Sequence, residues 1–173
     1  MPGCKWIEGR SLLLFAGMSL FASVVEAQEP QPIAGDEALV VEQGDGGRYW
    51  QRDPQQDKGN DAVRYPVEMA KAGIDGCVNI GFVIQPDGTT AGFRVLKSSL
   101  VDRRARTAFG AALARVVSKQ RFVPGPENPG RLTGFASTFA DFSLGRKGVT
   151  DRECRIDDLK AFILAVAEGT PAG

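Results

Sequence analysis

The feature that most constrains the fold is an alternating apolar pattern over residues 77–95, broken once by the motif Pro86-Asp87-Gly88. Apolar side chains occupy every second position on both sides of this motif, at Val78, Ile80, Phe82, Ile84, Phe93 and Val95. This is the period of a strand that buries one face. Proline presets φ at a central turn position, and glycine accepts a positive φ. The stretch therefore predicts two antiparallel strands joined by a tight turn.

Two helices are predicted beside this hairpin. A short one begins at Tyr65-Pro66, because proline is preorganised for a first helical turn, and Gly73 ends it. The main helix covers residues 102–119, with the Asp102 carboxylate at its N-terminus. Apolar residues recur at helical spacing on one side of the main helix, and arginines take the other side. We expect a solvated basic face there, with a basic docking patch as the alternative.

Composition fits one domain with extensions. A chain of 173 residues with 43% hydrophobic content can bury one core of good size. Its formal net charge is zero, which gives no indication of a nucleic-acid partner. Residues 132–144 supply a third predicted strand. Together these elements indicate an α+β domain over residues 63–145.

The N-terminal region has the pattern of an export signal. Lys5 and Arg10 precede an apolar run, and small residues lie near Ala27. We expect residues 1–27 to be a signal peptide cleaved after Ala27, because the run is short for a membrane-spanning anchor, which is the alternative. Residues 28–62 are acidic and lack any period, so they are predicted to be a flexible leader. A short strand or docking element at Tyr49-Trp50 is left open.

Taken together, the motifs over roughly residues 62–144 resemble the carboxy-terminal domain of TonB. They are, in order, Tyr65-Pro66, the GIDG approach from Gly73 to Gly76, the alternating strand, Pro86-Asp87-Gly88, the VLKSS segment from Val95 to Ser99, a helix ending in Arg121-Phe122-Val123-Pro124, and a strand ending in Asp141-Phe142-Ser143-Leu144. Their order and spacing carry the resemblance. It implies an α-β-β-α-β fold: a three-stranded antiparallel sheet with two helices on one face.

The resemblance also implies a function. In Gram-negative bacteria, TonB-like domains bind a short amino-terminal segment of an outer-membrane receptor, which adds as a strand beside the last strand of the domain. The corresponding partner-binding residues here are Thr133, Phe135, Ser137, Thr138, Phe139 and Asp141. A proline at Thr138 is expected to abolish binding at this edge. The alternative is a core strand whose edge is covered.

The chain departs from an energy transducer of this family. It contains no histidine, which such transducers use in their membrane helix, and its leader has few prolines where they carry a proline-rich rod. The predicted function is a periplasmic protein-binding domain that takes part in transport across the cell envelope. The alternative is a free-standing periplasmic adaptor or structural module that transduces no energy. A homodimer is left open, and membrane contact is expected only if the N-terminal segment is retained.

No enzymatic activity, cofactor or metal is predicted. The absence of histidine excludes Ser/His and Cys/His nucleophile pairs. Only Cys77 and Cys154 would remain after export, which is too few thiolates for a zinc site.

The C-terminal segment, residues 146–173, is predicted to be a helical extension. Thr150-Asp151-Arg152-Glu153 fits a capping box, and an apolar stripe follows at Ile156, Leu159, Phe162, Ile163 and Val166. This stripe is expected to cover the sheet face that the other helices leave open, where Cys77, Val83, Leu96, Phe135 and Phe139 point. A disulfide between Cys77 and Cys154 is expected in an oxidising compartment, with two separately buried thiols as the alternative.

Overall fold

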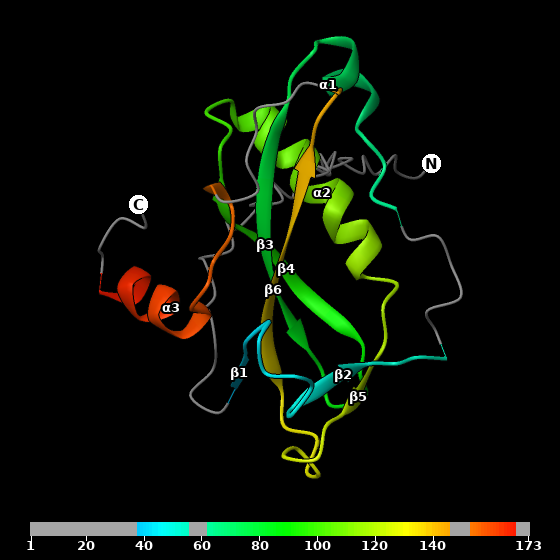
Figure 1. The fold of residues 1–173 in the computed structure, drawn as a ribbon, viewed down its shortest axis with the longest axis vertical. Coiled ribbons are helices and arrows are strands. Elements are labelled where there is room, and N and C mark those ends of the chain that lie inside the picture. Colours follow the sequence, from blue (N-terminus) through cyan, green and yellow to red (C-terminus); the bar gives the residue numbers. More distant parts are fainter. Residues whose placement is uncertain (1–37, 56–61, 146–152, 169–173) are drawn as a thin grey trace, which may run out of the picture. The chain divides into compact units, whose positions relative to one another are not determined.

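The computed structural model describes residues 38–55, 62–145 and 153–168. The predicted signal peptide, residues 1–27, lies outside these ranges. Helices and strands follow in the order β1 (Leu39–Val41), β2 (Trp50–Arg52), α1 (Val67–Lys71), β3 (Gly76–Ile84), β4 (Thr90–Ser98), α2 (Arg103–Val117), β5 (Phe122–Pro124), β6 (Gly134–Phe142) and α3 (Leu159–Ala167) (Figure 1).

The predicted hairpin is formed by β3 and β4, which pair antiparallel. At its turn, the Gly88 amide donates to the Gln85 carbonyl at 2.8 Å, and Gly88 has a φ of 81°. A Cβ atom at this position would lie 2.1 Å from the carbonyl oxygen of Phe122. Glycine is therefore required twice, for its backbone conformation and for the close approach of the β5 backbone.

The main sheet has four strands in the order β1-β6-β3-β4. β6 pairs antiparallel with β3 along its whole length, while β1 pairs with β6 in parallel. A second sheet joins β2 and β5 antiparallel. The prediction of a strictly three-stranded antiparallel sheet was therefore wrong. The additional strands contain three residues each, too few to produce a detectable alternation.

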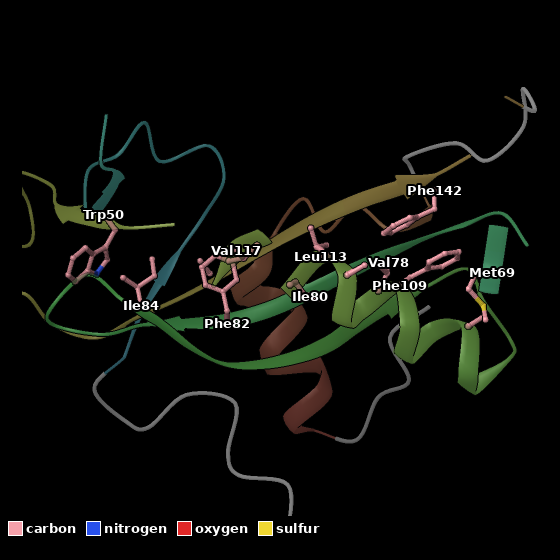
Figure 2. Packing of buried hydrophobic residues seen from close by; sticks show 13 residues of the cluster. Trp50, Met69, Val78, Ile80, Phe82, Ile84, Phe109, Leu113, Val117 and Phe142 are labelled. Atoms are coloured by element: carbon pink, nitrogen blue, oxygen red, sulfur yellow. The ribbon is translucent and has the colours of Figure 1, made fainter. Parts of the chain in front are cut away.

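One face of the main sheet packs against α1 and α2, as predicted. The alternating residues of β3 lie in this core together with Phe109 and Leu113 of α2 and Met69 of α1 (Figure 2). The rings of Phe109 and Phe142 stack with centroids 4.2 Å apart, and the Tyr65 ring meets both edge-on. The Tyr65 hydroxyl donates to the Ile74 carbonyl, which ties the segment before α1 to the segment between α1 and β3.

The opposite face is covered by the C-terminal segment. Phe135 of β6 is fully buried there with Ile156 and Leu159, and Phe162 and Ile163 pack around them. Figure 1 shows α2 and α3 on opposite sides of the sheet. The predicted covering of this face by the tail is therefore confirmed. Helix α3 begins at Leu159, and residues 150–152 of the predicted capping box lie outside the described residues. Asp158 is the N-cap of α3, accepting a hydrogen bond from the Ala161 amide at 2.7 Å.

The predicted disulfide joins Cys77 at the start of β3 to Cys154, with an S–S distance of 2.04 Å and a Cα–Cα distance of 5.9 Å. Both residues are fully buried. Cys154 precedes α3 by five positions, so the bridge fixes the segment that leads into the helix rather than the helix itself.

Residues 38–55 are part of the folded domain, although a flexible leader was predicted. Trp50 of β2 is buried, and its indole nitrogen donates to the Leu132 carbonyl at 3.1 Å. Gly134 leaves the space that the indole occupies, because a Cβ atom there would lie 2.8 Å from the ring. The alternative of a short strand at Tyr49-Trp50 was therefore correct, and one buried aromatic ring anchors a segment whose composition is otherwise polar.

Candidate docking edge on strand β6

The candidate site is the edge of β6 that faces away from β3. Successive residues of a strand point their backbone groups to opposite edges. The Thr133 carbonyl accepts from the Leu39 amide at 2.8 Å, and the Ser137 carbonyl accepts from the Gln43 side chain at 3.2 Å. Odd-numbered residues of β6 therefore present their backbone groups to this outer edge. Even-numbered residues present theirs to β3.

The first half of the outer edge is occupied. β1 pairs with β6 over Gly134–Ala136. The side-chain amide of Gln43 then donates to the next outward-facing carbonyl, that of Ser137. From Thr138 to Phe142, no strand among the described residues lies along this edge. The docking edge is thus covered at one end and open to a further strand at the other. The alternative of a covered strand applies to the first half of β6, and the docking role of the second half stays a prediction.

The predicted partner-binding residues lie in different environments along β6. Thr133 and Phe135 lie beside β1, with Phe135 fully buried, and Ser137 is buried under Gln43. Phe139 is half-buried, with the Arg155 guanidinium 5.3 Å from its ring centroid, and Asp141 is exposed.

Thr138 is the predicted site residue that needs correction. It pairs with Ile80 of β3, and its position in the alternation directs its amide toward β3. A proline there would break the central ladder instead of blocking a partner, so Thr138→Pro does not test docking. Phe139 is the neighbouring residue whose backbone faces outward. The sequence predicts the strand, but it does not predict which of its residues direct their backbone groups to the outer edge. That depends on which strands lie on either side of β6.

A groove of about 410 Å³ adjoins the open half of this edge. It is lined by Val41 to Gln43 at the end of β1, by Ala136 to Phe139 of β6, and by Arg52, Phe82, Gln120 and Phe122. A strand added beyond β1 would place alternate side chains toward this groove. The groove therefore offers a recess of mixed polar and apolar lining beside the half of the edge that no described strand pairs with, an arrangement that suits strand addition.

Sequence reasoning missed the contribution of Glu42 to this region. Its carboxylate accepts hydrogen bonds from the backbone amides of Leu159 at 3.0 Å and Lys160 at 2.9 Å. The first amides of a helix have no partner within the helix, and they attract a negative charge. Glu42 therefore caps a helix more than a hundred positions away in the sequence. No local pattern identifies such a contact.

Charged side chains around the sheet have specific neighbours. Arg94 of β4 lies 5.2 Å from the ring centroid of Phe135, and its burial lowers the pKa of its guanidinium. Arg48 forms a bidentate pair with Glu127 at 2.8 Å, which ties the loop before β2 to the loop after β5. Hydrogen bonding from Arg48 lowers the pKa of the Glu127 carboxyl.

The ranges that the structure describes contain no cluster of residues that could hold a metal ion. Within those same ranges, none of the helices has the length and apolar character needed to cross a membrane.

Comparison with known proteins finds similarity over the central part of the chain. No curated protein matches it. Among solved structures, the Pseudomonas aeruginosa TonB carboxy-terminal domain has 20% identity and a TM-score of 0.43, with 62% of this chain and 97% of that chain covered. A Helicobacter pylori TonB carboxy-terminal domain (residues 179-285) has 27% identity and a TM-score of 0.37, with 49% and 72% covered. The model of the family described as Gram-negative bacterial TonB protein C-terminal matches residues 61–140. Residues 61–140 of this chain therefore form a domain of the TonB C-terminal family.

Proposed function

We propose that this protein is a periplasmic binding domain that captures an extended segment of an outer-membrane receptor and takes part in transport across the cell envelope. Domains of the TonB C-terminal family act in envelope energy transduction and receptor interaction. The observation that carries the proposal is the outer edge of β6, where no described strand pairs from Thr138 onward and the groove lies alongside. Backbone groups at this edge supply affinity, and the groove supplies selectivity.

A pair of substitutions at Phe139 tests main-chain docking. Phe139→Pro removes an outward-facing amide, whereas Phe139→Ala removes the ring and keeps the amide. The probe is a set of synthetic peptides from the amino-terminal periplasmic segments of outer-membrane receptors, and affinity is measured by calorimetry. We expect Phe139→Pro to weaken binding at least about tenfold, and Phe139→Ala to weaken it less.

Near-ultraviolet circular dichroism of both variants establishes that the domain is folded. A folded Phe139→Pro protein that binds these peptides as tightly as the wild type would show that the partner does not add to this edge.

Periplasmic location is part of the same proposal. A disulfide between Cys77 and Cys154 is stable in an oxidising compartment, and the family is periplasmic in Gram-negative bacteria. We expect the mature protein to begin at Gln28. Its intact mass, measured on protein purified from the periplasm, tests this. A cleaved, freely soluble product would favour the adaptor function over direct energy transduction, and a retained N-terminal segment would favour the reverse.

A further inference from the structure

Strand β1 occupies the place where a docking partner would begin to pair. It lies on the outer edge of β6, it runs parallel to β6, and it ends where the open half of the edge starts. We propose that residues 39–42 are an internal latch: they fill the first half of the docking edge, and a partner segment of the same chemistry must displace them. This inference rests on the proposed function, because it concerns access to the same edge.

The backbone contacts of the latch are those of an added strand. The Leu39 amide donates to the Thr133 carbonyl, and the register continues through Val40 opposite Phe135 and Val41 opposite Ala136. In a parallel pair, alternate residues bond to the neighbouring strand. Leu39 and Val41 therefore direct their backbone groups to β6, and Val40 directs its groups away.

The side chains of the latch are recognised on both faces of the sheet. Val40 packs into the cluster of Phe135, Ile156 and Leu159 on the tail side. Val41 packs against the core on the α2 side. The edge therefore accommodates two successive apolar side chains, one on each face of the sheet.

The next residue after these two, Glu42, makes the most specific contact. It accepts from the Leu159 and Lys160 amides, while Asp158 caps the Ala161 amide of the same helix. Removal of the latch would leave the Leu159 and Lys160 amides without this acceptor. The tail itself would stay attached through the disulfide at Cys154, and Leu159 would keep Phe135 and Ile156 as neighbours in its cluster.

These contacts define the chemistry of the segment that fits. It is an extended peptide, parallel to β6, with two successive apolar residues followed directly by a carboxylate. The apolar pair would replace Val40 and Val41, and the carboxylate would bind the N-terminus of α3. Because the latch belongs to the same chain, its effective concentration is high. The apparent affinity of a partner is therefore lower than its intrinsic affinity, by a factor equal to the fraction of protein in which the latch is open.

A peptide of this chain serves as the probe. A fluorescent peptide with the sequence of residues 36–45, DEALVVEQGD, is titrated into the full chain. Two variants open the latch by different means. Val41→Pro removes an amide that faces β6, and Glu42→Lys places a cation at the N-terminus of α3. Glu168→Lys is the matched control, because it makes the same charge change at the exposed far end of α3.

We expect both open variants to bind the peptide at least about tenfold more tightly than the wild type or the control. A second peptide, in which the glutamate that corresponds to Glu42 is replaced by lysine, is expected to lose this binding. Hydrogen exchange gives a readout that needs no ligand: the Leu39 amide should exchange slowly in the wild type and at least about tenfold faster in Glu42→Lys.

The outcomes separate this inference from the proposed function. Equal peptide binding by all four proteins, or fast exchange of Leu39 in the wild type, would overturn the latch and leave the docking edge in place. Absence of peptide binding in every protein would also overturn it. Failure of the proposed function appears elsewhere, as receptor-peptide binding that survives Phe139→Pro.

Discussion

The two faces of the main sheet are closed by different parts of the chain. The first face is covered by α1 and α2, which lie next to β3 and β4 in the sequence and within the residues that match the TonB C-terminal family. The second face is covered by the tail from Cys154 onward, which lies outside the matched residues 61–140, and Val40 of the edge strand β1 adds to the same cluster. The family core thus closes one face with its own helices, whereas this chain closes the other with its extensions and one disulfide.

This difference has an energetic consequence. The first face holds most of the fully buried aliphatic and aromatic side chains, so its loss should unfold the domain. The second face depends on a smaller cluster with a covalent link, so its elements can loosen while the sheet persists. Opening of the proposed latch on this face therefore need not unfold the sheet.

The largest expected effect comes from Phe109→Ala on the first face. Phe109 is fully buried and stacks on Phe142, so its truncation to alanine leaves a cavity. The unfolding free energy should fall by about 3–5 kcal/mol. Urea denaturation measures this loss. Phe162→Ala on the second face is the comparison, and it should cost less because Phe162 is only partly buried. Equal losses would show that the two faces contribute alike.

Removal of the disulfide is expected to cost about 2–4 kcal/mol, because the bridge joins residues 77 positions apart and restricts the unfolded chain. Cys154→Ser should lower the unfolding free energy and make the tail susceptible to proteolysis before the sheet unfolds. Cys77→Ser should give the same loss, and the double variant should lose no more than either one. A tail that stays protease-resistant in both single variants would contradict the role assigned to the bridge.

A smaller effect is expected from Asn79→Ala. The Asn79 side chain is fully buried on the second face, and its amide nitrogen donates to the Cys154 carbonyl at 3.0 Å. Losing this hydrogen bond should cost about 1–2 kcal/mol. Because the bond and the disulfide hold the same segment, the Asn79→Ala and Cys154→Ser losses should not be additive. A double-mutant cycle by chemical denaturation measures the coupling, and strict additivity would argue against a shared role.

The smallest effect is a pH dependence at the exposed Arg48–Glu127 pair. Hydrogen bonding from Arg48 lowers the Glu127 pKa below its ordinary value of 4.5 in the folded protein. The pair therefore stabilises the fold above that value, and the contribution disappears as the pH falls through the lowered pKa. Thermal unfolding of wild type and Glu127→Gln should differ slightly near about pH 6 and converge toward about pH 2. A difference that grows on acidification would contradict this sign.

Much of the first face could be predicted from the sequence. The alternation in β3, the turn at Gly88 and the cap at Asp102 are local signals, and each appears where it was expected. The side-chain period of a strand is two, so the assignment of Phe135 to the second face also followed once β3 was placed. The pairing of Cys77 with Cys154 followed from the same assignment.

What only the tertiary structure decided concerns short elements and edges. Strand β1 has three residues, and its position comes from β6 on one side and from the amides of α3 that Glu42 caps. The start of α3 at Leu159 depends on that same distant carboxylate together with Asp158. The outward phase of Phe139 depends on which strand lies at which edge. The sequence by itself determined the long elements, because their side chains repeat often enough to select a face. Three residues or one helix end carry no such repeat, so long-range contacts had to place them.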